Sequence, residues 1–204
     1  MPQLVFSSLG LVDYVPTWHA MQEYVDSRDE QSEDRIWLLE HHPVFTLGQK
    51  ADPAHVIAAG EIPIVKIDRG GEVTYHGPGQ LVVYPQILLE RYKLGVRSLV
   101  SLLEDSVLEL LQQHGVSGKA DPEAPGVYID GAKVASIGLR IRRGASYHGL
   151  SINVNMDMSA FLRINPCGYQ DLKMTQLSDH IEGYSIEQAN SDISAILLRK
   201  LKGN

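Results

Sequence analysis

Apolar residues recur every three or four positions in three segments of the chain, the pattern of a helix with one buried face. Residues 97–114 carry the widest apolar stripe, and Gly115 is placed to end a helix there. Residues 14–27 and the segment that begins at Ser185 show the same spacing, and Ser185 with Gln188 forms a capping-box pattern. The apolar positions are, in chain order, Tyr14, Trp18, Met21, Tyr24, Val25, Leu99, Val100, Leu102, Leu103, Val107, Leu110, Leu111, Ile186, Ala189, Ile193, Ile196, Leu197 and Leu201. We expect a helix in each segment.

Short apolar runs bounded by turn residues predict strands at 3–8, 35–40, 62–68 and 80–87. After the long helix, residues 126–130 and 133–141 flank Asp130-Gly131, a strong hairpin signal, and a second turn at 142–145 leads to a strand over 147–156. These three strands are expected to form an antiparallel meander. Because strands do not alternate regularly with helices, the pattern favours an α+β fold, a mixed or antiparallel sheet packed with helices, over a doubly wound parallel sheet. Without a repeat or a linker, residues 1–204 are expected to be a single domain.

Composition and charge narrow the class of protein. With 44% hydrophobic and 21% charged residues among 204, the chain is an ordinary globular one and not a disordered one. A net charge of −7 argues against a protein that binds nucleic acid through its overall field. No apolar run is long enough to cross a membrane, and the N-terminal residues lack a signal or transit pattern. The only cysteine, Cys167, suits a reducing compartment, so we expect a cytoplasmic location.

The most unusual segment is residues 69–80, which contains four glycines and a proline among polar residues. Glycines let a backbone approach a ligand closely, and Arg69 and His76 could supply positive or switchable charge. The segment lacks the Gly-Lys-Ser/Thr ending of a P-loop, and it is not the dinucleotide fingerprint. A surface loop with turn glycines explains the same composition, so the composition alone leaves both readings open.

Strand parity places two ionisable groups on apolar faces. Alternate side chains of a strand share a face, so Lys133 is expected beside Ala135 and Ile137, and His148 beside Leu150. A strand-end lysine whose amine reaches water, or a hydrogen-bonded core histidine, would explain each residue alone. The two together favour function, because a buried lysine is rare unless it is paired or functional. Burial disfavours the charged amine, so such a lysine could exchange protons near neutral pH.

Cys167 lies between Pro166 and Gly168, in a turn that could present its sulfur to a cavity. An inert buried thiol is the alternative. A nucleophilic thiol needs a nearby cation or base, for which Lys133 and His148 are candidates. The histidines at 41, 42 and 55 lack an accompanying ligand spacing, so no metal site is expected. A local basic group on this acidic chain is either a solvated face or a dock for an acidic partner; it comprises Arg140, Arg142, Arg143 and Lys173.

Four motifs together resemble those of the lipoyl(octanoyl) transferases, in the same order and at matching spacing over nearly the whole chain. They are the segment 69–80, the stretch 125–138, the strand from His148-Gly149 to Asn153-Val-Asn155, and Pro166-Cys-Gly168. The resemblance implies a fold like that of the biotin and lipoate protein ligases, a sheet with helices on one side. Tyr128, where the family commonly has tryptophan, and Ser151, where alanine is common, depart from the family pattern.

The resemblance also implies an activity: transfer of an octanoyl group from octanoyl-acyl carrier protein to a specific lysine of a lipoyl domain. The implied acceptors are the lipoyl domains of 2-oxoacid dehydrogenase E2 subunits and the glycine cleavage H protein. The reaction would be ping-pong, with Cys167 carrying the acyl group as a thioester and Lys133 activating it. No cofactor is implied, because the donor is already an activated thioester, and we expect a monomer without nucleic-acid or membrane partners.

The substrate-binding segments of the family fall on three stretches of this chain, with His148 in support. They are Arg69, Gly70, Gly71, Glu72, Val73, Thr74, Tyr75, His76, Ser136, Ile137, Gly138, Gly149, Leu150 and Ser151. The main alternative is an ATP-dependent lipoate or biotin protein ligase, which would need adenylate-binding elements and would not need Cys167. A non-catalytic acyl- or peptide-binding module and a cysteine hydrolase are further alternatives.

Overall fold

The computed structural model describes residues 3–166 and 172–203. Its helices are α1 (Tyr14–Ser27), α2 (Val96–Gln113) and α3 (Ile186–Lys202). Its strands are β1 (Leu4–Val12), β2 (Asp34–His41), β3 (Val44–Leu47), β4 (Ile64–Lys66), β5 (Val73–His76), β6 (Gln80–Gln86), β7 (Lys119–Ala120), β8 (Gly126–Ile129), β9 (Ala132–Arg142) and β10 (Ala145–Asn153). Short 3-10 helices span Pro53–His55, Leu89–Tyr92, Met158–Arg163 and Leu177–Asp179. None of the described helices has the length and apolar character needed to cross a membrane.

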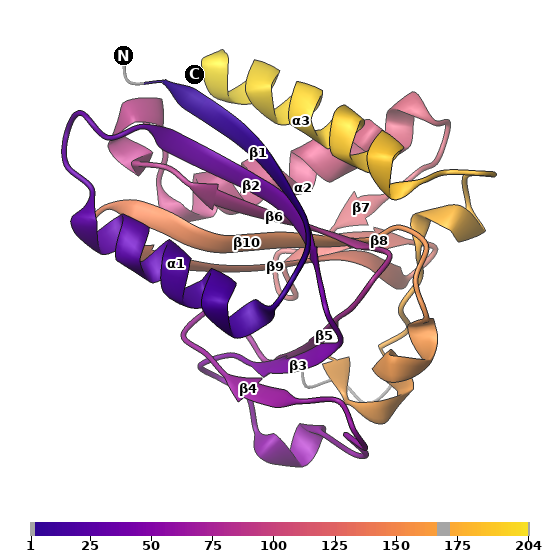
Figure 1. Ribbon diagram of the computed structural model, residues 1–204. Helices are drawn as coiled ribbons and strands as arrows, with labels where there is room; N and C mark the ends of the chain where they lie inside the picture. Colours follow the sequence, from indigo (N-terminus) through magenta and orange to yellow (C-terminus); the bar gives the residue numbers. More distant parts are fainter. Residues whose placement is uncertain (1–2, 167–171, 204) are drawn as a thin grey trace.

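The main sheet runs in the order β1-β2-β6-β10-β9-β8-β7 and is mixed (Figure 1). β1 and β2 are parallel, and the other neighbouring pairs are antiparallel. The predicted meander is confirmed as β8-β9-β10. Helices and strands do not alternate regularly along the chain, so the α+β prediction is confirmed.

The helix predictions are confirmed, including their ends. Ser185 accepts a hydrogen bond from the Gln188 backbone N–H, and the Gln188 side chain accepts one from the Ser185 N–H, which completes the capping box. Gly115 follows the end of α2 with a φ of 73°, a left-handed conformation that glycine adopts without strain.

Helices cover both faces of the main sheet, in contrast to the one-sided packing that the resemblance implied. α2 and α3 bury Leu103, Val107 and Ile193 against Leu38 and Val83. On the other face, α1 buries its own apolar stripe, which includes Met21 and Val25, against Leu39, Val82 and Tyr147. Neighbouring residues of one strand therefore point to opposite faces of the sheet, as the alternation of side chains requires. Leu38 and Val83 face α2 and α3, and Leu39 and Val82 face α1.

Two tight turns set the register of the meander. Asp130 and Gly131 both have positive φ, at 49° and 83°, as do Arg143 and Gly144, at 51° and 78°. Positive φ at both central residues defines the type I′ hairpin turn, whose twist matches the flanking strands. The dipeptide Asp130-Gly131 is therefore a correct hairpin prediction.

A second sheet, β4-β3-β5, lies at the bottom of Figure 1. β5 falls inside the segment 69–80, where no strand was predicted before residue 80, and β4 occupies only part of the predicted strand 62–68. β3 and β7 were not predicted. Tyr75 of β5 packs with Phe45 and Phe161 in a separate small core, which holds this sheet against the rest of the chain.

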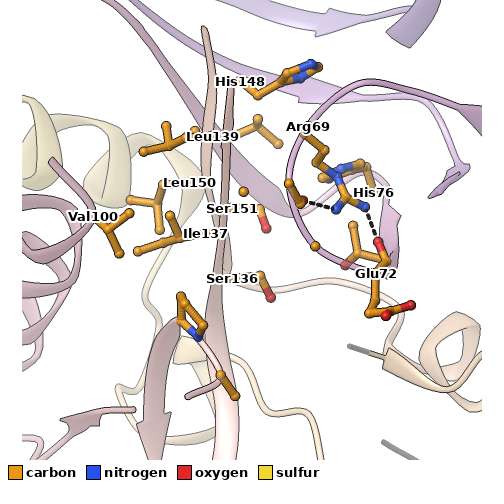
Figure 2. A pocket seen from close by; sticks show the side chains of 18 of the residues that line it. Arg69, Glu72, His76, Val100, Ser136, Ile137, Leu139, His148, Leu150 and Ser151 are labelled. Carbon is orange, nitrogen blue, oxygen red and sulfur yellow. Dashed lines mark hydrogen bonds between the residues drawn. The ribbon is translucent and has the colours of Figure 1, made fainter. Parts of the chain in front are cut away.

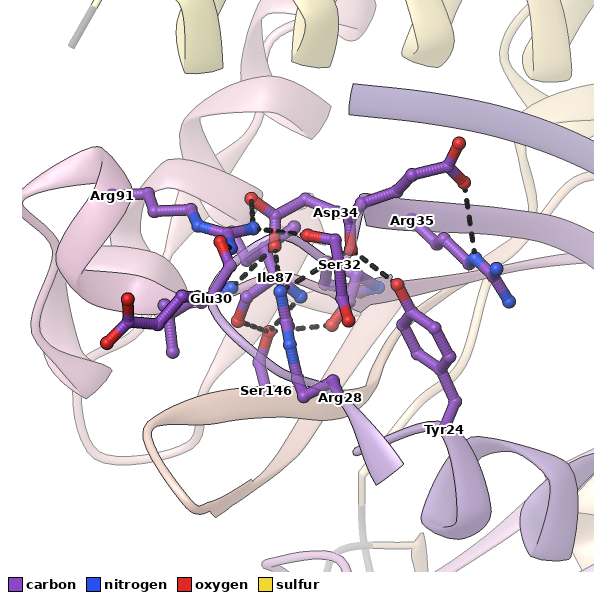
Figure 3. A network of polar contacts seen from close by, with 12 residues as sticks. Tyr24, Arg28, Glu30, Ser32, Asp34, Arg35, Ile87, Arg91 and Ser146 are labelled. Carbon is purple, nitrogen blue, oxygen red and sulfur yellow. Dashed lines mark hydrogen bonds and ion pairs between the residues drawn. The ribbon is translucent and has the colours of Figure 1, made fainter. Parts of the chain in front are cut away.

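A buried ion-pair network fixes the start of β2 (Figure 3). Asp34 is 1% exposed, and its carboxylate pairs with Arg28 at 2.6 Å and Arg91 at 3.2 Å. The same carboxylate accepts a hydrogen bond from the Leu88 backbone N–H at 2.8 Å. Charge-assisted bonds of this kind are strong when buried, so they tie the α1–β2 connection to the segment after β6.

Candidate functional site

A cavity of about 460 Å³ lies against strands β9 and β10 and beneath the loop that precedes β5. Every predicted substrate-binding residue lines it except Tyr75, which is buried in the small core instead. Lys133 and His148 line it as well. The structure thus brings together three stretches that are far apart in the sequence.

Lys133 is buried, as predicted, but it faces the other side of the sheet. Tyr128 pairs with Lys133 while Val127 pairs with Ala135, so Val134 is an extra residue in β9. This β-bulge lets Val134 and Ala135 both contact the core beneath α2 and α3. Lys133 lies with Tyr128 on the opposite face, its Nζ 5.3 Å from the centre of the Tyr128 ring. The parity argument was therefore wrong about the face, because it assumed an unbroken strand.

His148 departs from the parity prediction for a similar reason. Its φ of 54° breaks the alternation of β10, so the ring turns away from Leu150 and the core beneath α2. The imidazole lies instead near Tyr14 and Tyr84, and its Nε2 donates a hydrogen bond to Asp68 at 2.9 Å. A non-glycine residue in this conformation is uncommon, and such strain is often found at functional sites.

The two buried groups stand at opposite ends of the cavity. His148 pairs with Leu139, six residues from Lys133 along β9. At about 3.3 Å per residue their backbones are roughly 20 Å apart. His148 and Lys133 therefore cannot both be the cation beside one thiol.

Small side chains and glycines form one wall of the cavity. Ser136 pairs with Ser151, and Gly138 pairs with Gly149, on adjacent strands. A Cβ on Gly138 would lie 3.1 Å from both the Arg69 Cδ and the Gly70 carbonyl oxygen, so the loop approaches the sheet too closely for a side chain. Figure 2 shows Ser136 and Ser151 on the side of Arg69, with Ile137, Leu139, Leu150 and Val100 on the other side of the strands. The residues that line the cavity therefore lie on both faces of β9 and β10, with serines, glycines and the Arg69 loop on one face and aliphatic side chains on the other.

Arg69 organises the loop over the polar part of the cavity. The buried guanidinium donates hydrogen bonds to the carbonyls of Gly70 and Glu72 and to the carbonyl and hydroxyl of Thr46, at 2.8–2.9 Å. The Gly70 N–H donates to the Leu139 carbonyl at 3.0 Å, which docks the loop on β9. Arg69 thus holds the shape of the cavity, in addition to the charge expected of it.

Asp68 precedes this loop and accepts hydrogen bonds from side chains of two elements, α1 and β10. It accepts hydrogen bonds from Trp18 and Gln22 of α1, at 2.8 and 3.1 Å, and from Tyr147 and His148 of β10. Burial raises the pKa of Asp68, but the hydrogen bonds from His148 and Tyr147 outweigh it and hold that pKa well below its usual range. An ionised Asp68 therefore fixes the Nε2–H tautomer of His148.

The histidines around the cavity are neutral at neutral pH. Burial lowers the pKa of His41 to about 4 and that of His76 well below its ordinary value. Burial also lowers the pKa of His148, against the opposing hydrogen bond from Asp68. His41 donates from Nδ1 to the Val12 carbonyl at 3.1 Å and accepts at Nε2 from the Tyr84 hydroxyl at 2.8 Å. His76, expected to carry switchable charge, is instead a neutral ring stacked on Tyr14.

Cys167, the predicted nucleophile, lies outside the described residues. Chain segments on either side of it are described. Pro166 is buried, and the Lys173 carbonyl accepts a hydrogen bond from the Lys133 N–H at 2.8 Å. The Thr175 N–H in turn donates to the Lys133 carbonyl at 3.0 Å. Residues 173–175 therefore run along Lys133.

Several lining residues were not predicted: Tyr14, Lys50, Val82, Tyr84, Val96, Val100, Glu123, Ala124, Pro125 and Leu139. Half of them come from α1, β6 and α2, whose helical or strand pattern indicates only burial. Lys50 is exposed beside Gly71, and Arg140 donates to the neighbouring Gln49 at 3.1 Å. Arg142 and Arg143 of the predicted basic group instead contact Asp26 of α1.

The mixed sheet, its covering helices and the loop-covered cavity define a protein with the fold of lipoate and biotin protein ligases. A chain from a structural analysis of a bi-partite lipoate protein ligase and its E2 lipoyl domain, from Thermoplasma acidophilum, matches with a TM-score of 0.66 at 15% identity, covering 99% of this chain and 82% of that one. The biotin protein ligase of Aquifex aeolicus, with biotin and ATP, gives a TM-score of 0.57 at 13% identity over 99% and 71%.

The sequence comparisons make this more specific. Residues 13–197 match the lipoyl protein ligase A/B catalytic domain. A protein of Pseudomonas fluorescens (strain SBW25) named octanoyltransferase is 52% identical over 97% of this chain and 92% of its own. One of Vibrio vulnificus (strain YJ016) with the same name is 55% identical over 87% and 81%. The chain belongs to the lipoyl protein ligase A/B catalytic domain family.

Proposed function

We propose that this protein transfers an octanoyl group from octanoyl-acyl carrier protein to a lysine of lipoyl domains, through a thioester on Cys167. The acceptors proposed are the lipoyl domains of 2-oxoacid dehydrogenase E2 subunits and the glycine cleavage H protein. Relatives that are at least half identical carry the name octanoyltransferase, and a ligase of the same fold is described together with its E2 lipoyl domain as parts of an archaeal lipoylation system. A reducing cytoplasm suits a free thiol of this kind.

One observation carries the chemical proposal: a fully buried lysine faces a cavity that is walled by serine and glycine. Lys133 is 1% exposed and lies on the same face of β9 as Ser136 and Gly138. Buried lysines are rare without a functional or structural partner, and proton transfer is the chemistry they suit best. The segment 173–175, which follows Cys167, bonds to the backbone of Lys133 and supports their cooperation.

In the first half-reaction the Cys167 thiolate attacks the octanoyl thioester carbonyl. A carbon–sulfur bond forms, and a negative charge develops on the carbonyl oxygen. Backbone N–H groups of the loop at Gly71 and Glu72 are proposed donors, and such a donor stabilises an oxyanion by about 3–4 kcal/mol. As the tetrahedral intermediate collapses, the carbon–sulfur bond to the carrier breaks. The departing thiolate takes a proton from the Lys133 ammonium.

In the second half-reaction the acceptor lysine arrives as a neutral amine and attacks the Cys167 thioester. The carbon–nitrogen bond forms, the Cys167 thiolate leaves, and the neutral Lys133 amine accepts the proton lost by nitrogen. The enzyme returns to its initial thiolate and ammonium. The donor thioester supplies the driving force, so ATP is not required. Cys167 and Lys133 would titrate as a coupled pair.

The octanoyl tail is proposed to lie in the slot between the Arg69 loop and strands β9 and β10. Each buried methylene contributes about 0.8 kcal/mol. Tyr14, His76 and His148 line the cavity at the end away from Lys133. Their rings are neutral, so the apolar tail would meet no charged ring there. The exposed Lys50 and Arg140 near the loop are the proposed contacts for the acidic carrier protein, since Arg142 and Arg143 contact Asp26.

The experiment that separates this function from an ATP-dependent ligase supplies both kinds of substrate. Purified protein is mixed with an unmodified lipoyl domain and either octanoyl-acyl carrier protein alone or free octanoate with ATP. We expect octanoylation of the lipoyl domain from the carrier without ATP. Modification that occurs only with free octanoate and ATP would establish the ligase, for which the biotin ligase solved with ATP is the structural precedent.

A further inference from the structure

A buried carboxylate on α2, Glu104, is not used by the proposed chemistry. Its side chain belongs to the helix face of Val96 and Val100, which line the cavity at positions spaced by four. The residue is 8% exposed, and its Oε1 accepts a hydrogen bond from the Gly126 backbone N–H at 3.0 Å. Burying an ionised carboxylate costs free energy unless it is paired or hydrogen-bonded, so the contacts of Glu104 indicate its role.

Gly126 joins Glu104 to Lys133. A Cβ on Gly126 would lie 2.5 Å from Cε and 3.3 Å from Nζ of Lys133, so the end of the lysine packs directly on this glycine. The φ of Gly126 is 145°, which also favours glycine there. Gly126 therefore contacts the Lys133 side chain and also donates its N–H to the Glu104 carboxylate. The charge of Lys133 acts on Glu104, and opposite charges attract more strongly in a protein interior than in water.

The other charged groups around this pair are more exposed than Glu104. Asp105 on α2, Glu123 before β8 and Lys173 beside Lys133 are exposed, and Asp121 is half-buried. The Tyr128 ring on β8 faces the amine of Lys133, and its hydroxyl donates to the Ala124 carbonyl. Burial and the charge of Asp105 raise the pKa of Glu104, whereas the Gly126 hydrogen bond and the charge of Lys133 oppose that rise. Among these groups Glu104 is the most deeply buried acid.

We propose that Glu104 is a positioning residue for Lys133, holding Gly126 as the support of the amine and favouring its ammonium form. The inference rests on the proposed function, in which the first half-reaction needs the ammonium to protonate the departing thiol. Loss of the carboxylate would remove a negative charge from the surroundings of the amine, which disfavours the ammonium form.

The test is the pH profile of kcat/KM for octanoyl-acyl carrier protein in Glu104→Gln. Glutamine keeps an oxygen for the Gly126 N–H but removes the charge. We expect the alkaline limb of the profile to move to lower pH by about one unit, the scale of a unit charge nearby in a protein. A uniform loss of rate with an unmoved limb would assign Glu104 a structural role only and overturn the proposal.

Two variants control for charge and shape. Asp105→Asn makes the same charge change on the next, exposed residue, so the limb should stay in place. Glu104→Asp keeps the charge, so its limb should stay near the wild-type position even if the rate falls. An equal shift in Asp105→Asn and Glu104→Gln would show that the overall charge of the protein, and not the Glu104 carboxylate in particular, determines the pH of the alkaline limb.

A measurement on the wild-type protein tests the pair without relying on activity or on a folded variant. Side-chain carbon NMR follows Glu104 Cδ and Lys133 Cε through a pH titration. We expect Glu104 ionised at pH 7 and a second, smaller change of its signal as Lys133 titrates. A protonated Glu104 at pH 7, or no response to Lys133, would overturn the inference. Absence of octanoyl transfer would instead count against the proposed function.

Discussion

The buried His41 ring makes the stability of this protein depend on pH in a defined direction. Its pKa is lowered from 6.5 to about 4 by burial, whereas the same residue in the unfolded chain titrates near 6.5. Between these values the unfolded state takes up a proton that the folded state does not. The stability that His41 contributes is therefore complete above pH 6.5 and is lost as the pH falls towards 4.

The size of the effect follows from the same shift. Lowering the pKa by about 2.5 units corresponds to roughly 3 kcal/mol when the whole range is crossed. Between pH 7 and pH 5 the loss should be about 2 kcal/mol from this one ring. His76 and His148, whose pKa values are also lowered by burial, add to the dependence in the same direction.

The perturbation that isolates this contribution is His41→Gln. Glutamine can still donate to the Val12 carbonyl and accept from the Tyr84 hydroxyl, the two partners of the ring. The assay is urea unfolding at pH 7 and pH 5. The wild type should lose about 2 kcal/mol more than the variant over this interval. The neighbouring exposed His42 provides the control, because His42→Gln should keep the wild-type slope. An equal pH slope in His41→Gln and wild type would refute the reasoning.

Three further predictions concern the proposed reaction. Lys133→Met should lower kcat at least ~10²-fold, since it removes the proton carrier, and a near-normal pH–rate profile in stopped-flow assays would reject that role. Reversing the exposed charges in Lys50→Glu with Arg140→Glu should raise KM for the carrier protein but not for a small octanoyl thioester; an unchanged KM for the carrier would remove them from the docking surface. Ser151→Leu should narrow the slot and raise KM for octanoyl donors at least ~10-fold relative to butyryl donors, whereas Ser151→Ala should not; equal effects on both donors would place the tail elsewhere.

The sequence predicted those parts of the fold that depend on interactions between residues close together in the chain. The Asp130-Gly131 turn, the capping box at Ser185 and the stripe of α2 depend on neighbours within four residues, so one sequence contains them. The position of α1 on the opposite face, and the small sheet that includes β3 and β5, depend on contacts between distant segments. Short strands such as β3 and β5 are too short to show a clear periodicity of apolar residues, so the sequence did not predict them.

The site shows the same division. The predicted substrate-binding residues do meet at one cavity, with Tyr75 the exception. Parity failed at Lys133 and His148 because a bulge at Val134 and a positive φ at residue 148 each reverse the face of a strand. The acids associated with His148 and Lys133 are Asp68 and Glu104, which lie in other elements. An isolated acid in a helix or loop is usually solvated, so the sequence did not single them out. A bulge needs knowledge of the partner strand, which only the folded structure supplies.

The central claim is that Cys167 carries the octanoyl group. The most direct measurement is the intact mass of the protein, followed by peptide mapping, after mixing with octanoyl-acyl carrier protein in the absence of an acceptor. The account predicts a gain of one octanoyl group on the peptide that contains Cys167, removed by adding a lipoyl domain and absent in Cys167→Ser. No mass gain in the wild type, or an equal gain in Cys167→Ser, would contradict it.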